Sequence, residues 1–351
     1  MSIRELLREN IRSLEPYSSA RDDFSGTASV FLDANENWQD FVDFDNINRY
    51  PDPHSSAVKR AVSEVFGYDE RMVSIGNGSD ELIDIMYRLF CTPGRDSVLI
   101  MPPTYGEYKV LASINDVAVH TVVQNSDFSL NLEAIKHALD EYSPKLMFIC
   151  SPNNPTGVSV PFEVIKELTE YNRGITVVDE AYLDFSSNRS AVDLIAGNER
   201  VVVLRTLSKA WALAGGRIGI SVTSPEIADL IYMVKYPYNV PLLSQAYAAA
   251  ALYRADRVRE EVALTVAERE RVKKLLEETE GVHTVFSSDA NFLLVRMNKA
   301  HEVFLELRKR GIIVRDRSRE VLCDSCLRIT IGSREENDLL VSAVREVLGG
   351  V

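Results

Sequence analysis

Short apolar segments alternate with helix-like segments along the first two thirds of the chain, and this alternation limits the possible folds more than any other feature. Residues 146–150, 175–178 and 201–204 are apolar or β-branched throughout, as is typical of strands that are covered on both faces. Strands that alternate with helices indicate a mostly parallel sheet with crossover helices. We therefore predict an α/β domain between about residues 30 and 238.

Polar residues stand just beyond each of these three segments. Asn154, Asp179 and Lys209 follow the first, second and third segment. Ligands of open α/β sheets bind beyond the carboxyl ends of the strands, so we expect these side chains to converge. Burial and a nearby arginine such as Arg217 would lower the pKa of Lys209 enough for it to form a Schiff base. The alternative for Lys209 is a solvated surface lysine.

This combination meets the requirements of pyridoxal 5'-phosphate, which needs a Schiff-base lysine and a carboxylate beside its pyridinium nitrogen. Lys209 would carry the Schiff base and act as acid and base. Asp179 would keep the ring nitrogen protonated. Asn154 and Tyr182 would bind the phenolate oxygen of the ring.

A site for the cofactor phosphate is predicted at residues 73–81, which have the pattern of a strand, a glycine turn and a helix start. Gly78 allows a tight turn, and free N–H groups near Ser79 and Asp80 suit a phosphate. An ordinary N-capped helix is the alternative. Further groups for an anion are Thr206, Ser208 and Arg217.

Tyr105 follows the apolar segment 98–101 in a Pro-Pro-Thr-Tyr-Gly sequence. Its ring could stack on the pyridine ring of the cofactor. A buried core tyrosine is the alternative.

Six motifs occur in order along the chain, at residues 48–51, 102–106, 151–157, 179–182, 205–210 and 327–330. They resemble those of the fold-type I pyridoxal-phosphate aminotransferases and, within them, the histidinol-phosphate aminotransferases. The resemblance covers nearly the whole chain and implies a large domain with a seven-stranded, mostly parallel sheet, a smaller α+β domain and an N-terminal arm. We place the arm at 1–28, the large domain at 29–252 and the small domain at 253–351.

The resemblance also implies an activity, which is ping-pong transfer of an amino group between histidinol phosphate with 2-oxoglutarate and imidazole-acetol phosphate with glutamate. It implies a homodimer in which Tyr50 reaches the cofactor phosphate of the neighbouring subunit. Arg315 and Arg328 would bind the anionic groups of the substrates, although Arg315 could instead pair with Asp316 or Glu320. The other implied substrate contacts are Tyr17, Tyr238 and Asn291.

Three alternatives to this function remain open at the level of sequence. Threonine-phosphate decarboxylase and aromatic amino-acid aminotransferase would use the same cofactor groups. A cofactor-binding regulatory protein without turnover would keep these groups only as a relic. An attached DNA-binding segment would favour that last alternative, and we find none in the sequence.

The composition favours small-molecule substrates. A formal net charge of −13 argues against nucleic acid or an anionic membrane as a nonspecific partner, so an anionic substrate would need local arginines. No apolar segment approaches the roughly 20 residues of a membrane span, and charged residues interrupt the first segment, which leads us to expect a cytoplasmic protein. Cys323 and Cys326 have the spacing of half a zinc or redox site, but without a second Cys or His pair we expect no metal.

Apolar spacing gives two further expectations for the ends of the chain. Residues 3–14 have the pattern of one amphipathic helix, whose apolar face a lone monomer would leave uncovered. Residues 257–280 are charged and helix-like, and this long helix would join the two domains. Its predicted buried stripe is Val262, Leu264, Val266, Val272, Leu275 and Leu276. The small domain would then contain strands at 282–286, 292–295 and 327–331, and a helix at 302–309.

Overall fold

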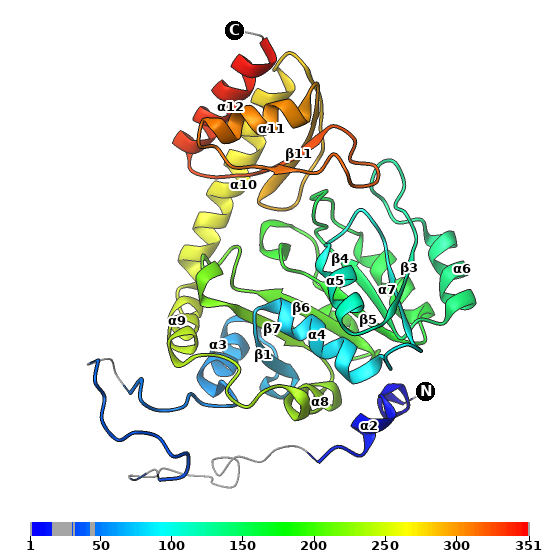
Figure 1. Ribbon diagram of the computed structural model, residues 1–351, viewed down its shortest axis with the longest axis vertical. Coiled ribbons are helices and arrows are strands. Elements are labelled where there is room, and N and C mark those ends of the chain that lie inside the picture. Colours follow the sequence, from blue (N-terminus) through cyan, green and yellow to red (C-terminus); the bar gives the residue numbers. More distant parts are fainter. Residues whose placement is uncertain (1, 16–29, 31, 43–45, 350–351) are drawn as a thin grey trace.

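A mostly parallel sheet forms the centre of the larger part of the molecule (Figure 1). The computed structural model describes residues 2–15, 30, 32–42 and 46–349, and within them seven strands pair in the order β1-β7-β6-β5-β4-β2-β3. Strand β7 is antiparallel to both of its neighbours, and the other pairs are parallel. The predicted α/β class is therefore confirmed. The strands are β1 Val73–Asn77, β2 Ser97–Ile100, β3 Ala118–Thr121, β4 Leu146–Cys150, β5 Ile175–Asp179, β6 Val201–Thr206 and β7 Ile218–Val222.

Helices cover both faces of this sheet, which explains why its central strands are apolar without interruption. Successive side chains of a strand point to opposite faces, and accordingly Val177 and Val178 belong to two different apolar clusters. The helices of the first cluster are α3 Ser56–Phe66, α6 Leu132–Tyr142, α7 Phe162–Tyr171 and α9 Leu242–Leu252. Those of the second are α4 Ser79–Phe90, α5 Glu107–Ile114 and α8 Pro225–Val234.

The N-terminal segment differs from the predicted single helix. It forms two short helices, α1 Ile3–Leu6 and α2 Glu9–Arg12, with extended backbone at Leu7 and Arg8 between them. At this break the backbone N–H of Arg8 donates to the carbonyl oxygen of Leu89 over 2.9 Å, near the end of α4. The last carbonyl groups of a helix lack partners within it. The N–H of Arg8, which is outside both short helices, therefore pairs with a carbonyl group near the end of α4.

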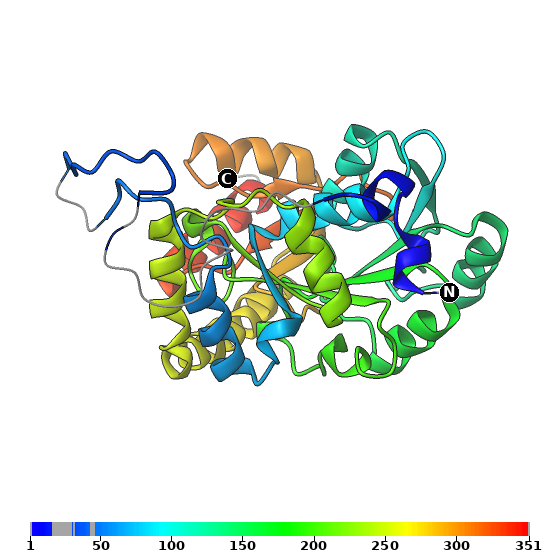
Figure 2. The ribbon, with the colours of Figure 1, turned by 90° about the horizontal axis from the view of Figure 1, so that it is seen from below.

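The apolar face of this segment is covered by the same chain, contrary to our expectation. Ile3, Leu6, Leu7 and Ile11 are buried in the cluster that contains α4 and α5, and only Leu14 is substantially exposed. Figure 2 shows the segment lying over the body of the larger part. An uncovered arm therefore gives no argument for a second subunit.

A second, antiparallel sheet forms the smaller part of the fold. In the described part of the chain its four strands pair in the order β10-β11-β9-β8 and pack against α11 and α12. The strands and the helix predicted here from apolar spacing are confirmed, within a few residues at each end. The elements are β8 Val282–Val285, β9 Phe292–Met297, α11 Ala300–Lys309, β10 Arg315–Asp316, β11 Cys326–Thr330 and α12 Arg334–Gly349.

The long helix α10 Ala255–Glu277 connects the two parts, as predicted (Figure 1). Val262 and Val266 pack with residues of both parts, and Val272 and Leu276 are buried in the core of the smaller part. Leu264 is a correction, because it is 65% exposed. At about 100° per residue it points away from the face that carries the residues two positions before and after it.

Neither a membrane helix nor a cluster of metal ligands is present in the described residues. No helix there has both the length and the apolar character that crossing a bilayer requires. No group of three or more His, Cys, Asp or Glu side chains is arranged to hold a metal ion in that part of the chain. Cys323 and Cys326 are buried free thiols, as are the other two cysteines.

Candidate active site

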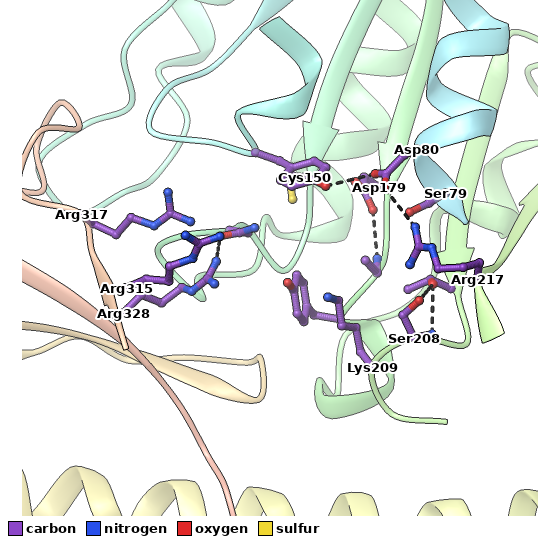
Figure 3. A pocket seen from close by; sticks show the side chains of 15 residues that line it. Ser79, Asp80, Cys150, Asp179, Ser208, Lys209, Arg217, Arg315, Arg317 and Arg328 are labelled. Atoms are coloured by element: carbon purple, nitrogen blue, oxygen red, sulfur yellow. Dashed lines mark hydrogen bonds and ion pairs between the residues drawn. The ribbon is translucent and has the colours of Figure 1, made fainter. Parts of the chain in front are cut away.

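A cavity lies at the carboxyl ends of β4, β5 and β6, and the smaller part of the fold contributes one of its walls (Figure 3). Its empty volume is about 740 Å³, including space open to solvent. The three residues expected to converge all line it. The predicted site residues in the lining are Ser79, Asp80, Tyr105, Asn154, Asp179, Tyr182, Thr206, Ser208, Lys209, Arg217, Arg315 and Arg328.

Asp179 is the last residue of β5 and is enclosed on all sides but the cavity. Its Oδ2 accepts a hydrogen bond from the hydroxyl of Tyr108 over 2.7 Å, and its Oδ1 accepts one from the backbone N–H of Ala181 over 3.1 Å. Burial raises the pKa of the Asp179 carboxyl, although both hydrogen bonds act in the opposite direction. A cationic N–H group in the cavity would therefore stabilise its charged form.

Lys209 follows β6 and extends into the cavity, where its Nζ lies 5.7 Å from the ring centroid of Tyr182. Burial lowers the pKa of the Lys209 amine, and the positive charge of Arg328 lowers it further. Both effects increase the fraction of neutral amine, which is the nucleophilic and basic form.

The start of α4 forms another wall of the cavity. Gly78 is the N-cap and has a positive φ of 78°. Because glycine has no side chain, the N-cap residue does not bind the first N–H groups of the helix. A Cβ atom at Gly78 would lie 2.4 Å from Nη2 of Arg217, and the positive φ disfavours any residue with a side chain. This geometry does not match the alternative of a helix capped by its own Ser or Asp side chain, and it leaves N–H donors for an anion.

Asp80 connects three elements at this end of the cavity. Its Oδ1 accepts a hydrogen bond from the hydroxyl of Tyr105 over 3.1 Å, and its Oδ2 accepts one from Nη2 of Arg217 over 3.3 Å. Thr206 lies on the neighbouring β6, and its hydroxyl donates to Oγ of Ser208 over 3.0 Å. Two hydroxyl groups and a guanidinium group thus lie beside the helix N-terminus, which is a donor set for a phosphate.

The smaller part of the fold contributes arginines on the other side of the cavity (Figure 3). Arg315 of β10 and Arg328 of β11 are directly opposite each other in the antiparallel pair, so their side chains leave the sheet on the same face. Nη1 of Arg328 donates to Oδ1 of Asn154 over 2.5 Å. Burial lowers the pKa of Arg328, and the charges of Arg317 and Arg315 lower it further.

The alternative partners considered for Arg315 are engaged elsewhere. Asp316 pairs with His301, and Glu320 pairs with Arg317. No carboxylate within the described ranges forms an ion pair with Arg315. Its guanidinium group is therefore available to a ligand.

Two residues that the sequence analysis did not single out belong to this site. Tyr108 contacts Asp179 from α5, and Arg317 lines the cavity beside the other two arginines. The sequence could have indicated Tyr108, because it lies three residues after Tyr105, about the spacing of one helical turn. It could also have indicated Arg317, because residues two positions apart in a strand, such as Arg315 and Arg317, share a face.

Five predicted contacts lie outside the cavity lining or outside the described residues, and one of them is Gly78, the N-cap of α4. Tyr50 and Tyr238 stack on each other with a centroid distance of 4.4 Å, and neither lines the cavity of its own chain. Asn291 is also absent from the lining; its backbone carbonyl accepts a hydrogen bond from Ile331 over 2.9 Å. Tyr17 lies outside the described residues.

Comparisons with known proteins identify the family of the chain. The family described as aminotransferase class I and II matches residues 19–344. The histidinol-phosphate aminotransferase of Parabacteroides distasonis is 44% identical over 345 residues, which cover 98% of this chain and 99% of the relative. That of Christiangramia forsetii is 42% identical over 348 residues, which cover 99% and 98%.

Solved structures share the fold. The crystal structure of the histidinol-phosphate aminotransferase from Sinorhizobium meliloti, in complex with pyridoxal-5'-phosphate, matches with a TM-score of 0.79 at 24% identity. The match covers 86% of this chain and 83% of that one. At this level of identity, the likeness concerns the fold.

Proposed function

The chain belongs to the class I and II aminotransferase family, and from this premise we propose that it is a pyridoxal-phosphate-dependent histidinol-phosphate aminotransferase. It interconverts histidinol phosphate with 2-oxoglutarate and imidazole-acetol phosphate with glutamate. The relatives with this name support the proposal, since they match the chain along nearly its whole length. The structural observation that carries it is the pair Arg315 and Arg328, which face the cavity that contains Lys209.

The donor set of the cavity fits pyridoxal phosphate. When bound, this cofactor supplies an electrophilic carbon for an amine and a ring that accepts the electron pair left on the substrate carbon when its proton departs. The buried Asp179 carboxylate suits a cationic ring nitrogen, because the two hydrogen bonds that it accepts do not fully offset its burial. The N-terminus of α4, together with Arg217 and the hydroxyls of Thr206 and Ser208, suits the cofactor phosphate.

Asn154 and Tyr182 complete the proposed cofactor contacts. Oδ1 of Asn154 is already used by Arg328, so its NH₂ group is the part that would bind the ring oxygen. Burial raises the pKa of Tyr182, which keeps its hydroxyl protonated and able to donate. Tyr105, held by Asp80, provides an aromatic face at the rim of the cavity.

Lys209 performs the proton transfer in this proposal. Its neutral amine would remove the proton from the substrate carbon that bears nitrogen, and the ammonium group so formed would return that proton later in the half-reaction. The lowered pKa supports the first step, and proximity within a partly closed cavity supports the second.

The anion-binding side serves both half-reactions. Arg328 is placed by β11 and by its bond to Asn154, and a guanidinium group binds carboxylate or phosphate in a bidentate manner. Arg315 adds a second positive charge next to it. The same groups therefore bind the phosphate of histidinol phosphate and a carboxylate of glutamate in turn.

The test is a single-turnover experiment with the cofactor-loaded protein and four separate amines: histidinol phosphate, histidinol, threonine phosphate and phenylalanine. Histidinol phosphate should react with an efficiency at least about tenfold above that of histidinol, since each charge-assisted contact contributes about 1.5–3 kcal/mol. Equal efficiency would contradict the phosphate site. Carbon dioxide release from threonine phosphate without 2-oxoglutarate would favour threonine-phosphate decarboxylase, and preference for phenylalanine would favour an aromatic aminotransferase.

We further propose a homodimer with shared active sites. Tyr50 is about half exposed and lies outside the cavity of its own chain, which is compatible with a role in the cavity of a second copy. The segment with the exposed Trp38 and Phe41 extends away from the body of the fold (Figures 1 and 2). A second subunit that covered these aromatic side chains would remove their exposed apolar surface from water.

The remaining substrate contacts and the location are also proposals. Tyr17, Tyr238 and Asn291 would reach the substrate in the assembled dimer. We assign the enzyme to the cytoplasm, because its four cysteines are free thiols, as is usual in a reducing compartment. The arm, the large domain and the small domain would comprise residues 1–28, 29–252 and 253–351.

A further inference from the structure

Arg317 lies with Arg315 and Arg328 on one wall of the cavity, and we propose that it is a third anion-binding residue that favours a phosphate dianion over a single carboxylate. The inference rests on the proposed function, because the phosphate in question is that of the substrate. Arg317 would therefore determine specificity and take no part in the proton transfer.

The backbone fixes the position of Arg317. Its N–H donates to the carbonyl oxygen of Cys326 over 2.9 Å, which continues the β10–β11 pairing by one residue beyond Asp316. Residues two positions apart in a strand share a face, so Arg317 lies on the same face as Arg315. Figure 3 shows the three guanidinium groups together, across the cavity from Lys209 and Arg217.

The side chain of Arg317 is held in this position. Its Nη1 donates to Oε1 of Glu320 over 2.5 Å, and about a quarter of the side chain is exposed. Nε of Arg317 and Nε of Arg328 are enclosed and have no acceptor among the described residues. Because these two Nε atoms are enclosed, a phosphate in the cavity would bind through the terminal nitrogens of the guanidinium groups that line it, and it offers several acceptor oxygens to them.

The local charge also matches a phosphate. The wall carries the positive charges of Arg315, Arg317 and Arg328, and Glu320 is the carboxylate that pairs with one of them. Asp316 lies between Arg315 and Arg317, so its side chain points to the opposite face, where it bonds to His301. The surplus is thus two positive charges, whereas a phosphate monoester has a charge of about −1.5 to −2 at pH 7 and a carboxylate has −1. Arg317 thus adds positive charge that a phosphate neutralises and that a single carboxylate leaves uncompensated.

The experiment compares Arg317→Gln with Arg319→Gln in the cofactor-loaded protein. Arg319 is exposed on the same loop and does not line the cavity, so it controls for the change in net charge. Single-turnover efficiency is measured separately for histidinol phosphate and for glutamate. We expect Arg317→Gln to lose at least about tenfold with histidinol phosphate, equivalent to about 1.4 kcal/mol, and clearly less with glutamate, while Arg319→Gln resembles the wild type. An equal loss with both substrates, or none, would overturn the inference.

Inhibition by inorganic phosphate gives a second measurement that does not depend on the identity of the substrate. With the cofactor bound, its own phosphate site is filled, and inorganic phosphate should compete with glutamate more weakly in Arg317→Gln than in the wild type. If the wild type does not use histidinol phosphate, the proposed function fails, and this competition still tests Arg317. Arg317→Lys keeps the charge and replaces Arg317→Gln if that variant does not fold. It should retain phosphate competition better than Arg317→Gln. Equal phosphate competition in the wild type and the variants would refute the role of Arg317.

Discussion

The hydroxyl of Tyr108 donates a hydrogen bond to Oδ2 of Asp179 over 2.7 Å, and both side chains are buried. Tyr108 belongs to α5 and Asp179 to β5, so the contact joins a crossover helix to the strand that carries the carboxylate. Burial raises the pKa of Asp179, and this hydrogen bond opposes that effect. Tyr108 therefore helps to keep Asp179 charged for a cationic ligand.

Tyr108→Phe should slow transamination by about tenfold or more, because a hydrogen bond to a charged group contributes about 1.5–3 kcal/mol. The lower limb of the pH–rate profile should move to higher pH, since the pKa of Asp179 rises further without the hydroxyl. Turnover measured across pH checks both effects. Tyr171→Phe is the control, as Tyr171 also donates to an aspartate, Asp140, but at the surface. Equal behaviour of the two variants would contradict the role of Tyr108.

Asp179→Asn should still bind the cofactor yet react far more slowly, by several kcal/mol in the activation barrier if electrostatic stabilisation of the transition state dominates. Cofactor binding by equilibrium dialysis and turnover should be measured on the same preparation. Unchanged turnover would remove Asp179 from this role.

Lys209→Ala should abolish covalent attachment of the cofactor and nearly all transamination, because the neutral amine is both the nucleophile and the base. Borohydride reduction followed by peptide mapping identifies the modified lysine. Lys166→Ala, at an exposed position on α7, should leave attachment unchanged. Reduction of the cofactor onto a different lysine in the wild type would show the assignment to be wrong.

Arg328→Lys should weaken both half-reactions, in contrast to changes at Arg317. Lysine keeps the charge but cannot form two parallel hydrogen bonds with an anion or reproduce the contact with Asn154 in the same geometry. We expect KM to rise by about tenfold or more for histidinol phosphate and for glutamate alike. Steady-state kinetics with each substrate provide the measurement, and Arg334→Lys, on the exposed start of α12, is the matched control. A change confined to one substrate would disagree with a shared anion site.

Mixed dimers test whether Tyr50 acts in the neighbouring subunit. Refolding Lys209→Ala chains with Tyr50→Ala chains should restore activity above that of either parent, because one site of each mixed dimer then has both residues and the other has neither. Activity is measured on mixed dimers purified by two different affinity tags. Absence of recovery would favour sites built from one chain, with Tyr50 serving only to stack on Tyr238.

Glu180 should make stability depend on pH. Burial raises its pKa to about 7 from an ordinary value of 4.5, against the opposing charge of Arg205. Because the folded protein binds this proton more tightly than the unfolded chain does, the stability from Glu180 is fully present below pH 4.5 and is lost as the pH rises through about 7. Between these values the slope is at most about 1.4 kcal/mol per pH unit.

Urea unfolding of the wild type and of Glu180→Gln, measured at about pH 5 and about pH 7, isolates this contribution. The variant should lose less stability over this interval than the wild type, since glutamine does not titrate. The buried carboxyl of Asp179 is common to both proteins and cancels in the comparison. An identical pH dependence would contradict the elevated pKa of Glu180.

The sequence alone was sufficient to predict the central strands and the cavity at their ends. Segments such as 146–150 and 175–178 contain only residues that are stable when covered on both faces, so their burial follows from local composition. Parallel neighbours place their carboxyl ends at one edge of the sheet, which brings Asp179 and Lys209 together without knowledge of any side-chain contact. The motifs around them then indicated the cofactor.

Tertiary contacts decided the features that the sequence analysis missed. The break in the N-terminal segment depends on Arg8 meeting the end of α4, and the role of Tyr108 depends on the packing of α5 against β5. The position of Arg317 beside Arg328 depends on the register between β10 and β11. Apolar periodicity determines which face of an element is buried. It does not show which distant residue packs against that face, because this contact depends on the packing of the whole chain.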